Sequence, residues 1–147
     1  TSSHLGIYRA RPDVMSIVHT HSHYATAFAA AGRPIPCVLT AIADEFGGDV
    51  PLGGYASIGG NEIGEEIVRS IGHSPAIVMK HHGVFAIGPT IKKAVQAAIM
   101  VEDVAYTVSI AEGLAHLERL PHEEIEKNFD RYSHRYGTDA ASEGLTR

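Results

Sequence analysis

Short apolar runs, separated by polar or glycine-rich turns, predict the strands of this 147-residue chain. The runs are brief and rich in β-branched residues, which favours buried strands over helices. They cover residues 14–19, 37–40, 76–79 and 84–87, with a further edge segment at 50–52. His81, His82 and Gly83 separate the last two runs, and this turn predicts the tip of a β-hairpin.

Apolar residues at helical spacing predict helices around these strands. The predicted helices cover residues 2–11, 23–31, 61–71, 91–117 and 123–135. Gly32 is suited to end the second helix, and Asn61 and Thr90 are expected to cap the third and fourth. We expect loops at 43–49 and 53–60. The last ten residues carry no periodic apolar signal and are expected to lie outside any packed element.

This alternation of strands and helices predicts a mixed α/β fold in which helices cover a central sheet. The chain contains no internal repeat, low-complexity tract or linker, and its length suits one hydrophobic core. We therefore expect a single domain over residues 1–147. Because the chain opens on Thr1 and enters its first helix almost at once, we also expect it to be the later part of something longer.

Composition removes several classes of partner. The formal net charge is −5, so there is no basic surface of the kind that binds nucleic acid. We expect no membrane span, because no apolar run approaches the required length, and no signal peptide opens the chain. The single cysteine, Cys37, cannot form an internal disulfide, which fits a cytoplasmic protein. We expect it to be a buried structural thiol.

Histidine is the residue type that suggests chemistry, because five of the ten histidines fall in two short clusters. His19 and His21 lie two residues apart at a strand end, so their side chains project from the same face. Two neutral imidazoles form half of a transition-metal site. The hairpin tip offers a third, and spacing alone leaves both His81 and His82 open. The alternative is that the strand-end histidines simply face solvent.

The other histidines are interpreted more simply. Five are scattered along the chain and are expected to be surface or core residues: His4, His73, His116, His122 and His134. His23 is expected to lie in a helix and is left out of the site.

Three histidines leave the fourth position of zinc open, which is typical of a catalytic site. Mn²⁺ or Co²⁺ would also suit imidazole ligands.

Asp44 is the second candidate for chemistry. It lies in an expected loop, and loops often present catalytic groups. A carboxylate beside a metal can act as a general acid or base. The alternative is an ordinary loop-capping aspartate, and Glu45 offers a weaker version of the same hypothesis.

Several segments resemble motifs of the class II aldolase/adducin family, and within it most of all the L-ribulose-5-phosphate 4-epimerases. They occur in the family order over roughly residues 3–115. The segments are Ser3-His4-Leu5-Gly6-Ile7-Tyr8-Arg9, Ile17-Val18-His19-Thr20-His21-Ser22, Ala25-Thr26-Ala27, Ala43-Asp44-Glu45-Phe46-Gly47-Gly48-Asp49-Val50-Pro51 and His82-Gly83-Val84-Phe85-Ala86-Ile87-Gly88.

The resemblance implies an α/β/α sandwich around a mostly antiparallel sheet, assembled as a homotetramer with active sites at subunit interfaces. It implies that His19, His21 and His82 are the metal-binding histidines, and this match is the reason for choosing His82 over His81. Asp44 matches the acid/base aspartate of the epimerases. The N-terminal portion of the family, with its phosphate-binding loops, has no counterpart here.

The implied activity is zinc-dependent epimerisation of a ketopentose phosphate. In that reaction the C3–C4 bond breaks to give a metal-stabilised enediolate, and the aldehyde half rotates and rejoins. A class II sugar-phosphate aldolase, similar to L-fuculose-phosphate aldolase, would instead release the aldehyde. A relative that dehydrates or decarboxylates its substrate and a non-catalytic adducin-like interaction module are further alternatives. The three histidines favour an enzyme, because an interaction module does not need them.

Overall fold

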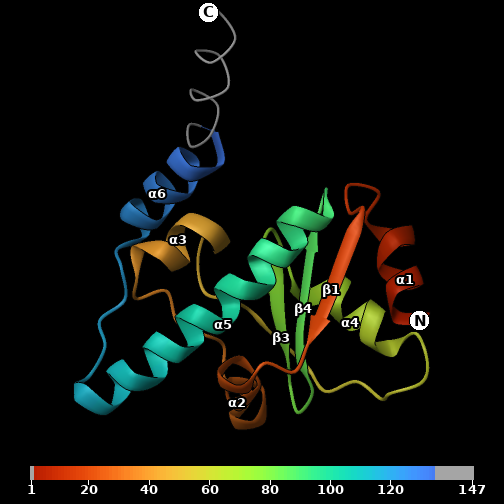
Figure 1. Ribbon diagram of the computed structural model, residues 1–147, viewed down its shortest axis with the longest axis horizontal. Helices are drawn as coiled ribbons and strands as arrows, with labels where there is room; N and C mark the ends of the chain where they lie inside the picture. Colours follow the sequence, from red (N-terminus) through yellow and green to blue (C-terminus); the bar gives the residue numbers. More distant parts are fainter. Residues whose placement is uncertain (1, 135–147) are drawn as a thin grey trace, which may run out of the picture.

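The structure is a computed structural model and describes residues 2–134 of the chain (Figure 1). Helices and strands follow one another as α1 (Ser2–Ala10), β1 (Ser16–Thr20), α2 (His23–Ala31), α3 (Thr40–Phe46), β2 (Leu52–Gly53), α4 (Glu62–Ser70), β3 (Ala76–Met79), β4 (Gly83–Gly88), α5 (Ile91–Leu114) and α6 (His122–His134). The expectation for the last ten residues lies outside the described part of the chain.

The four strands form one sheet in the order β1-β4-β3-β2. β4 pairs antiparallel with both β1 and β3, whereas β2 pairs parallel with β3. The expected mostly antiparallel sheet is therefore confirmed. Thr20 pairs with Val84 and Met79 pairs with Gly83, so the end of β1 and the β3–β4 hairpin tip lie at the same end of the sheet (Figure 1).

Side chains alternate between the two faces of the sheet and so build two cores. On one face, Val78, Val84 and Ala86 pack with residues of α2, α3 and α5. On the other, Ile77 and Phe85 pack with residues of α1 and α4. The chain thus folds as an α/β/α arrangement, as the sequence predicted.

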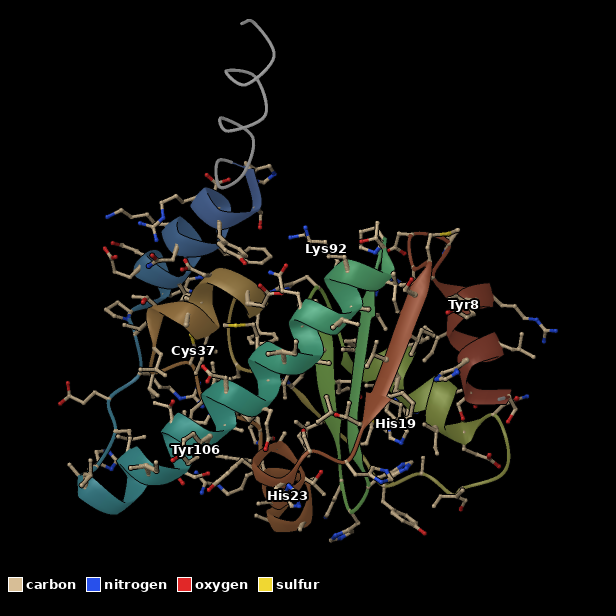
Figure 2. The ribbon with its side chains drawn as sticks, in the orientation of Figure 1. Tyr8, His19, His23, Cys37, Lys92 and Tyr106 are labelled. Atoms are coloured by element: carbon tan, nitrogen blue, oxygen red, sulfur yellow. The ribbon has the colours of Figure 1, made fainter. Side chains whose placement is uncertain are left out.

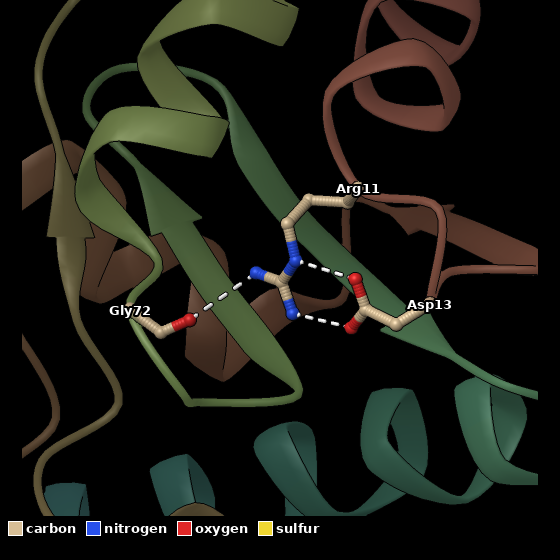
Figure 3. A network of polar contacts seen from close by, with 3 residues as sticks. All are labelled: Arg11, Asp13 and Gly72. Atoms are coloured by element: carbon tan, nitrogen blue, oxygen red, sulfur yellow. Dashed lines mark hydrogen bonds and ion pairs between the residues drawn. The ribbon is translucent and has the colours of Figure 1, made fainter.

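The turn after α1 is fastened to the turn after α4 by Arg11 (Figure 3). Its Nε and Nη2 donate to the two carboxylate oxygens of Asp13, at 2.9 and 2.7 Å, and its Nη1 donates to the carbonyl oxygen of Gly72 at 3.3 Å. This fork-to-fork geometry orients both partners. It supports the side-by-side packing of α1 and α4.

Two predicted segments around position 40 were wrong. Residues 37–40 do not form a strand, and most of the expected loop at 43–49 belongs to α3, which runs from Thr40 to Phe46. The helix buries Ile42, Ala43 and Phe46 against the core and ends at Gly47, whose φ of 67° closes the last turn. The apolar character of residues 37–39 reflects packing of extended chain against that core.

Smaller differences concern helix ends. Thr90 caps α5 as predicted, because its Oγ1 accepts a hydrogen bond from the amide of Lys93. Asn61 stands at the start of α4, but its side chain makes no capping hydrogen bond. α5 ends at Leu114, three residues before the predicted 117.

The expectation that no segment is long enough for a membrane span was wrong for α5. Within residues 2–134 it alone has the length and apolar composition to cross a membrane. A helix that packs on a core passes the same test, and α5 lies across β1 and β4 and buries Ala97, Val101 and Val104 there (Figure 1). This packing accounts for the apolar residues on the buried side of α5, whereas Ile99, Ile110 and Leu114 of the same helix are exposed.

Candidate metal centre

Three imidazole rings converge where β1 ends and the β3–β4 hairpin turns. One nitrogen from each of His19, His21 and His82 lies within 4.8 Å of the other two. The ring centroids are 4.7 Å apart for His19 and His21, 4.9 Å for His19 and His82, and 5.3 Å for His21 and His82. The structure thus brings together the three histidines that the sequence singled out.

The backbone explains this convergence. His19 lies near the end of β1 (Figure 2), and its ring stacks on Phe85 of the core that faces α1 and α4. His21 follows two residues later, and its ring contacts that of His19. His82 belongs to the hairpin tip, where its amide donates to the carbonyl oxygen of Met79 at 2.9 Å. His81 takes a positive φ of 59°, an uncommon conformation for a residue other than glycine. Its amide hydrogen-bonds Ala29 of α2, which anchors the tip.

One ring nitrogen of His19 is already engaged. Its Nδ1 donates to the carbonyl oxygen of Val84 at 2.8 Å, because a carbonyl can only accept. The lone pair is then left on Nε2. A hydrogen bond of this kind fixes the tautomer and the ring orientation of histidines that bind metals.

Electrostatics favour the neutral imidazoles that metals require. Burial lowers the pKa of His82, and the neighbouring rings of His19 and His21 lower it further. Burial also lowers the pKa of His19, and His21 adds to this, although the hydrogen bond to Val84 opposes the shift. Both rings are therefore neutral over a wider pH range than a free histidine.

The donor set fits a transition metal. Zinc binds imidazole nitrogen at about 2.0–2.1 Å, which separates the nitrogens of a tetrahedral site by roughly 3.4 Å. The three nitrogens lie within 4.8 Å, so small ring rotations suffice to bring them to an ion. His19 and His21 are exposed, which leaves room for a further ligand. Such openness is characteristic of catalytic rather than structural zinc sites.

Asp44 does not join the triad within one chain. It lies on α3 and lines a cavity of about 560 Å³ together with Ile87 and Pro89, at the far end of β4. With about 3.4 Å per strand residue, Ile87 lies roughly 17 Å along the strand from His82. Asp44 Oδ1 is 3.5 Å from Nη2 of Arg131 on α6. Neighbouring Glu45 is buried and accepts a hydrogen bond from Gln96.

Two residues near the triad escaped the sequence analysis. Phe85 stacks on His19, with centroids 4.1 Å apart and an interplanar angle of 17°. His4, interpreted as an isolated histidine, lies on α1 with its ring edge-on to Phe85 at 6.3 Å. Burial, the N-terminal charge and His19 lower its pKa. No signal in the sequence pointed to Phe85, because its place opposite His19 depends on the register in which β1 pairs with β4.

Comparison with known proteins identifies the family. Residues 1–108 match the model of the family described as "Class II Aldolase and Adducin N-terminal domain". The chain belongs to the class II aldolase and adducin family. This agrees with the resemblance drawn from the sequence motifs, and it covers all three histidines.

Individual relatives are enzymes of sugar-phosphate chemistry. The chain is 34% identical to a 5-methylthioribulose-1-phosphate/5-deoxyribulose-1-phosphate aldolase from Rhodospirillum rubrum, covering 93% of this chain and 62% of the relative. It is 39% identical to L-ribulose-5-phosphate 4-epimerase UlaF from Salmonella paratyphi B, covering 78% and 55%. Among solved structures, an L-fuculose 1-phosphate aldolase aligns with a TM-score of 0.84 and 28% identity, covering 90% and 62%.

The chain therefore spans about 55–62% of the length of the curated relatives it matches. Both epimerases and aldolases occur among the similar proteins, so the class II aldolase/epimerase superfamily is established for this chain.

Proposed function

We propose that this chain carries the divalent-metal centre of a sugar-phosphate enzyme that epimerises a ketopentose phosphate. The observation that carries the proposal is the convergence of His19, His21 and His82, from one strand end and one hairpin tip, with nitrogens within 4.8 Å. When bound there, zinc supplies a Lewis acid that stabilises negative charge developing on substrate oxygens. Mn²⁺ or Co²⁺ would suit the same nitrogens.

In this proposal, residues of the chain orient the metal ligands and admit the substrate. His19 is held by its Nδ1 hydrogen bond to Val84, which directs Nε2 into the site. The open side of the triad admits the ketone end of the substrate. In the proposed reaction, one carbon–carbon bond is broken, the aldehyde half rotates, and the bond forms again on its other face.

Asp44 is proposed as the acid/base that exchanges a proton with the hydroxyl next to the broken bond. Since Asp44 lies at the far end of β4 from the triad of its own chain, we propose that it serves the triad of a neighbouring copy. This requires an oligomer, and a homotetramer with sites between subunits is the assembly implied by the family resemblance. The single buried cysteine and the bacterial relatives support a cytoplasmic location.

An aldolase is the second candidate, because one similar relative and the aligned solved structure carry that name. The two reactions share the bond cleavage and differ afterwards. Incubation with L-ribulose 5-phosphate separates them: an epimerase converts the substrate into its C4 epimer, whereas an aldolase releases a free aldehyde.

The metal centre is tested by elemental analysis of the wild type and of His82→Ala. We expect about one zinc per chain in the wild type and loss of metal in the variant. The trans role of Asp44 is tested with Asp44→Asn and His82→Ala, each inactive alone. Mixing them under conditions that exchange subunits would restore part of the activity, because some interfaces regain an intact triad and an intact aspartate. No recovery after verified exchange would refute the trans role.

A further inference from the structure

Phe85 forms the floor of the triad. It lies in β4 directly opposite His19 in the β1–β4 register, and its side chain is only 3% exposed. Its ring lies nearly parallel to that of His19, at 4.1 Å and 17°. The same ring meets His82 edge-on, with centroids 5.8 Å apart and an angle of 77°. One buried aromatic side chain thus contacts two of the three candidate ligands.

The contacts of Phe85 extend to a third element. His4, on α1, approaches the ring edge-on at 6.3 Å and 76°. Histidines from α1, from the end of β1 and from the hairpin tip are therefore arranged around a single phenyl ring. Phe85 itself is held in the core between the sheet, α1 and α4. Because it is buried, the Phe85 ring is held in place more firmly than the partly exposed histidine rings that contact it.

Stacking limits how His19 can rotate. The Nδ1 hydrogen bond to Val84 O fixes one point of the imidazole, and the phenyl face fixes its plane. Together they leave Nε2 one direction, toward His21 and His82. A smaller apolar residue at position 85 would keep the hydrogen bond but release the plane.

We infer that Phe85 is a positioning residue of the metal centre, which sets the ring planes of His19 and His82 before a metal binds. This inference rests on the proposed metal site. It adds to that site a determinant of metal affinity that bears no donor atom. Groups that orient metal ligands without touching the metal commonly change affinity by about 10- to 100-fold.

The test compares Phe85→Leu with Ile87→Val. Ile87 lies two residues further along β4, on the same face and in the same core, and is 4% exposed. Both changes remove a small volume of buried apolar side chain, but only the first removes a contact with the triad. Co²⁺ is the probe, because its visible absorption reports both binding and coordination geometry. Melting of the metal-free proteins measures the purely structural effect.

We expect Phe85→Leu to weaken Co²⁺ binding about tenfold and to change the absorption spectrum. Ile87→Val should bind Co²⁺ within twofold of the wild type, although both variants lower the melting temperature of the metal-free protein. Equal Co²⁺ affinity and spectra for wild type and Phe85→Leu would overturn the positioning role and leave the triad standing. A wild type that binds no Co²⁺ or Zn²⁺ would instead remove the proposed metal site and this inference together.

A measurement on the metal-free wild type covers the case in which Phe85→Leu does not fold. A fixed stack places the ring protons of His19 in the shielding zone of the phenyl face. We expect them upfield of the other histidine signals in proton spectra, with His19→Asn providing the assignment. Unshifted His19 signals would mean that the ring moves freely, and would overturn the inference.

Discussion

The ring of His21 packs directly on the backbone of Gly83. A β-carbon at position 83 would lie 2.5 Å from Cδ2 of His21 and 2.6 Å from the carbonyl oxygen of Thr20. Both distances are far below ordinary contact. Glycine is therefore required at the start of β4 because the end of β1 and a candidate ligand approach its backbone closely.

We predict that Gly83→Ala destabilises the metal-free protein by about 1–3 kcal/mol, the usual range for overpacking, and weakens metal binding by displacing His21. Gly113→Ala is the matched control. Gly113 lies within α5 with nothing near its would-be β-carbon, so the change should stabilise by about 0.5–1 kcal/mol. Urea unfolding measures both. Equal effects of the two changes would contradict the close approach.

Glu102 of α5 holds the start of α2, which follows directly on the His19-x-His21 segment. Its two carboxylate oxygens accept hydrogen bonds from the amides of Tyr24 and Ala25, at 3.0 and 2.9 Å. Glu102→Gln leaves one amide without an acceptor, and we predict a loss of about 1 kcal/mol in unfolding free energy. Asp103→Asn, at an exposed neighbouring position, should stay within about 0.5 kcal/mol. The idea fails if the two variants unfold at the same urea concentration.

The pH dependence of stability follows from the histidines. Burial lowers the pKa of His4, His19 and His82 below the value of about 6.5 expected for the unfolded chain. Between these values the unfolded chain binds more protons, so the unfolding free energy decreases as the pH falls. The stabilisation is present above pH 6.5 and is lost as the pH falls through the folded-state values.

Urea unfolding of the metal-free protein at pH 7.5, 6.5 and 5.5 would show this decrease. His19→Asn keeps a donor for Val84 but does not titrate in this range, and should give a shallower slope. An unfolding free energy that is constant from pH 7.5 to 5.5 would contradict the prediction. Metal affinity should fall over the same range, because protons compete for the imidazole nitrogens.

Cys37 is predicted to be inert in the folded protein. Burial raises the pKa of its thiol to about 11, with a further increase from Asp49 and an opposing effect of Arg119. The reactive form is the thiolate, which is scarce at pH 8 under these conditions. A disulfide reagent at pH 8 should label the native protein far more slowly than the urea-unfolded chain. Rapid labelling of the native protein at one thiol per chain would refute the prediction.

The sequence predicted the parts of the fold whose periodicity was unambiguous. The β-branched run before His19 and the glycine after His82 indicated a strand end and a hairpin tip. These patterns left His81 and His82 open as the third ligand, and the family resemblance selected His82. The segment from Cys37 to Phe46 misled because its apolar residues serve two purposes. Residues 37–39 pack as extended chain and 40–46 as a helix, and both bury apolar side chains in one core. Gly47 as a helix stop was the overlooked signal.

The position of Asp44 lay beyond sequence reasoning for a different reason. Periodicity identifies the face of a strand or helix, but not the end of the sheet at which the next element packs. α3 reaches the far end of β4 because it packs on α6, more than seventy residues later in the chain. Likewise, the stacking of Phe85 on His19 depends on the pairing register, which is a tertiary property.

The antiparallel register that opposes His19 to Phe85 also restricts how this chain can diverge. A one-residue insertion or deletion within β1 would turn His19 and His21 toward α5, on the wrong side of the sheet. Length changes in the glycine-rich segment 53–60 or between α5 and α6 leave that pairing untouched. Descendants of this fold are thus free to remodel the surroundings of the histidines, and with them the molecules admitted, while β1 and β4 keep a constant length.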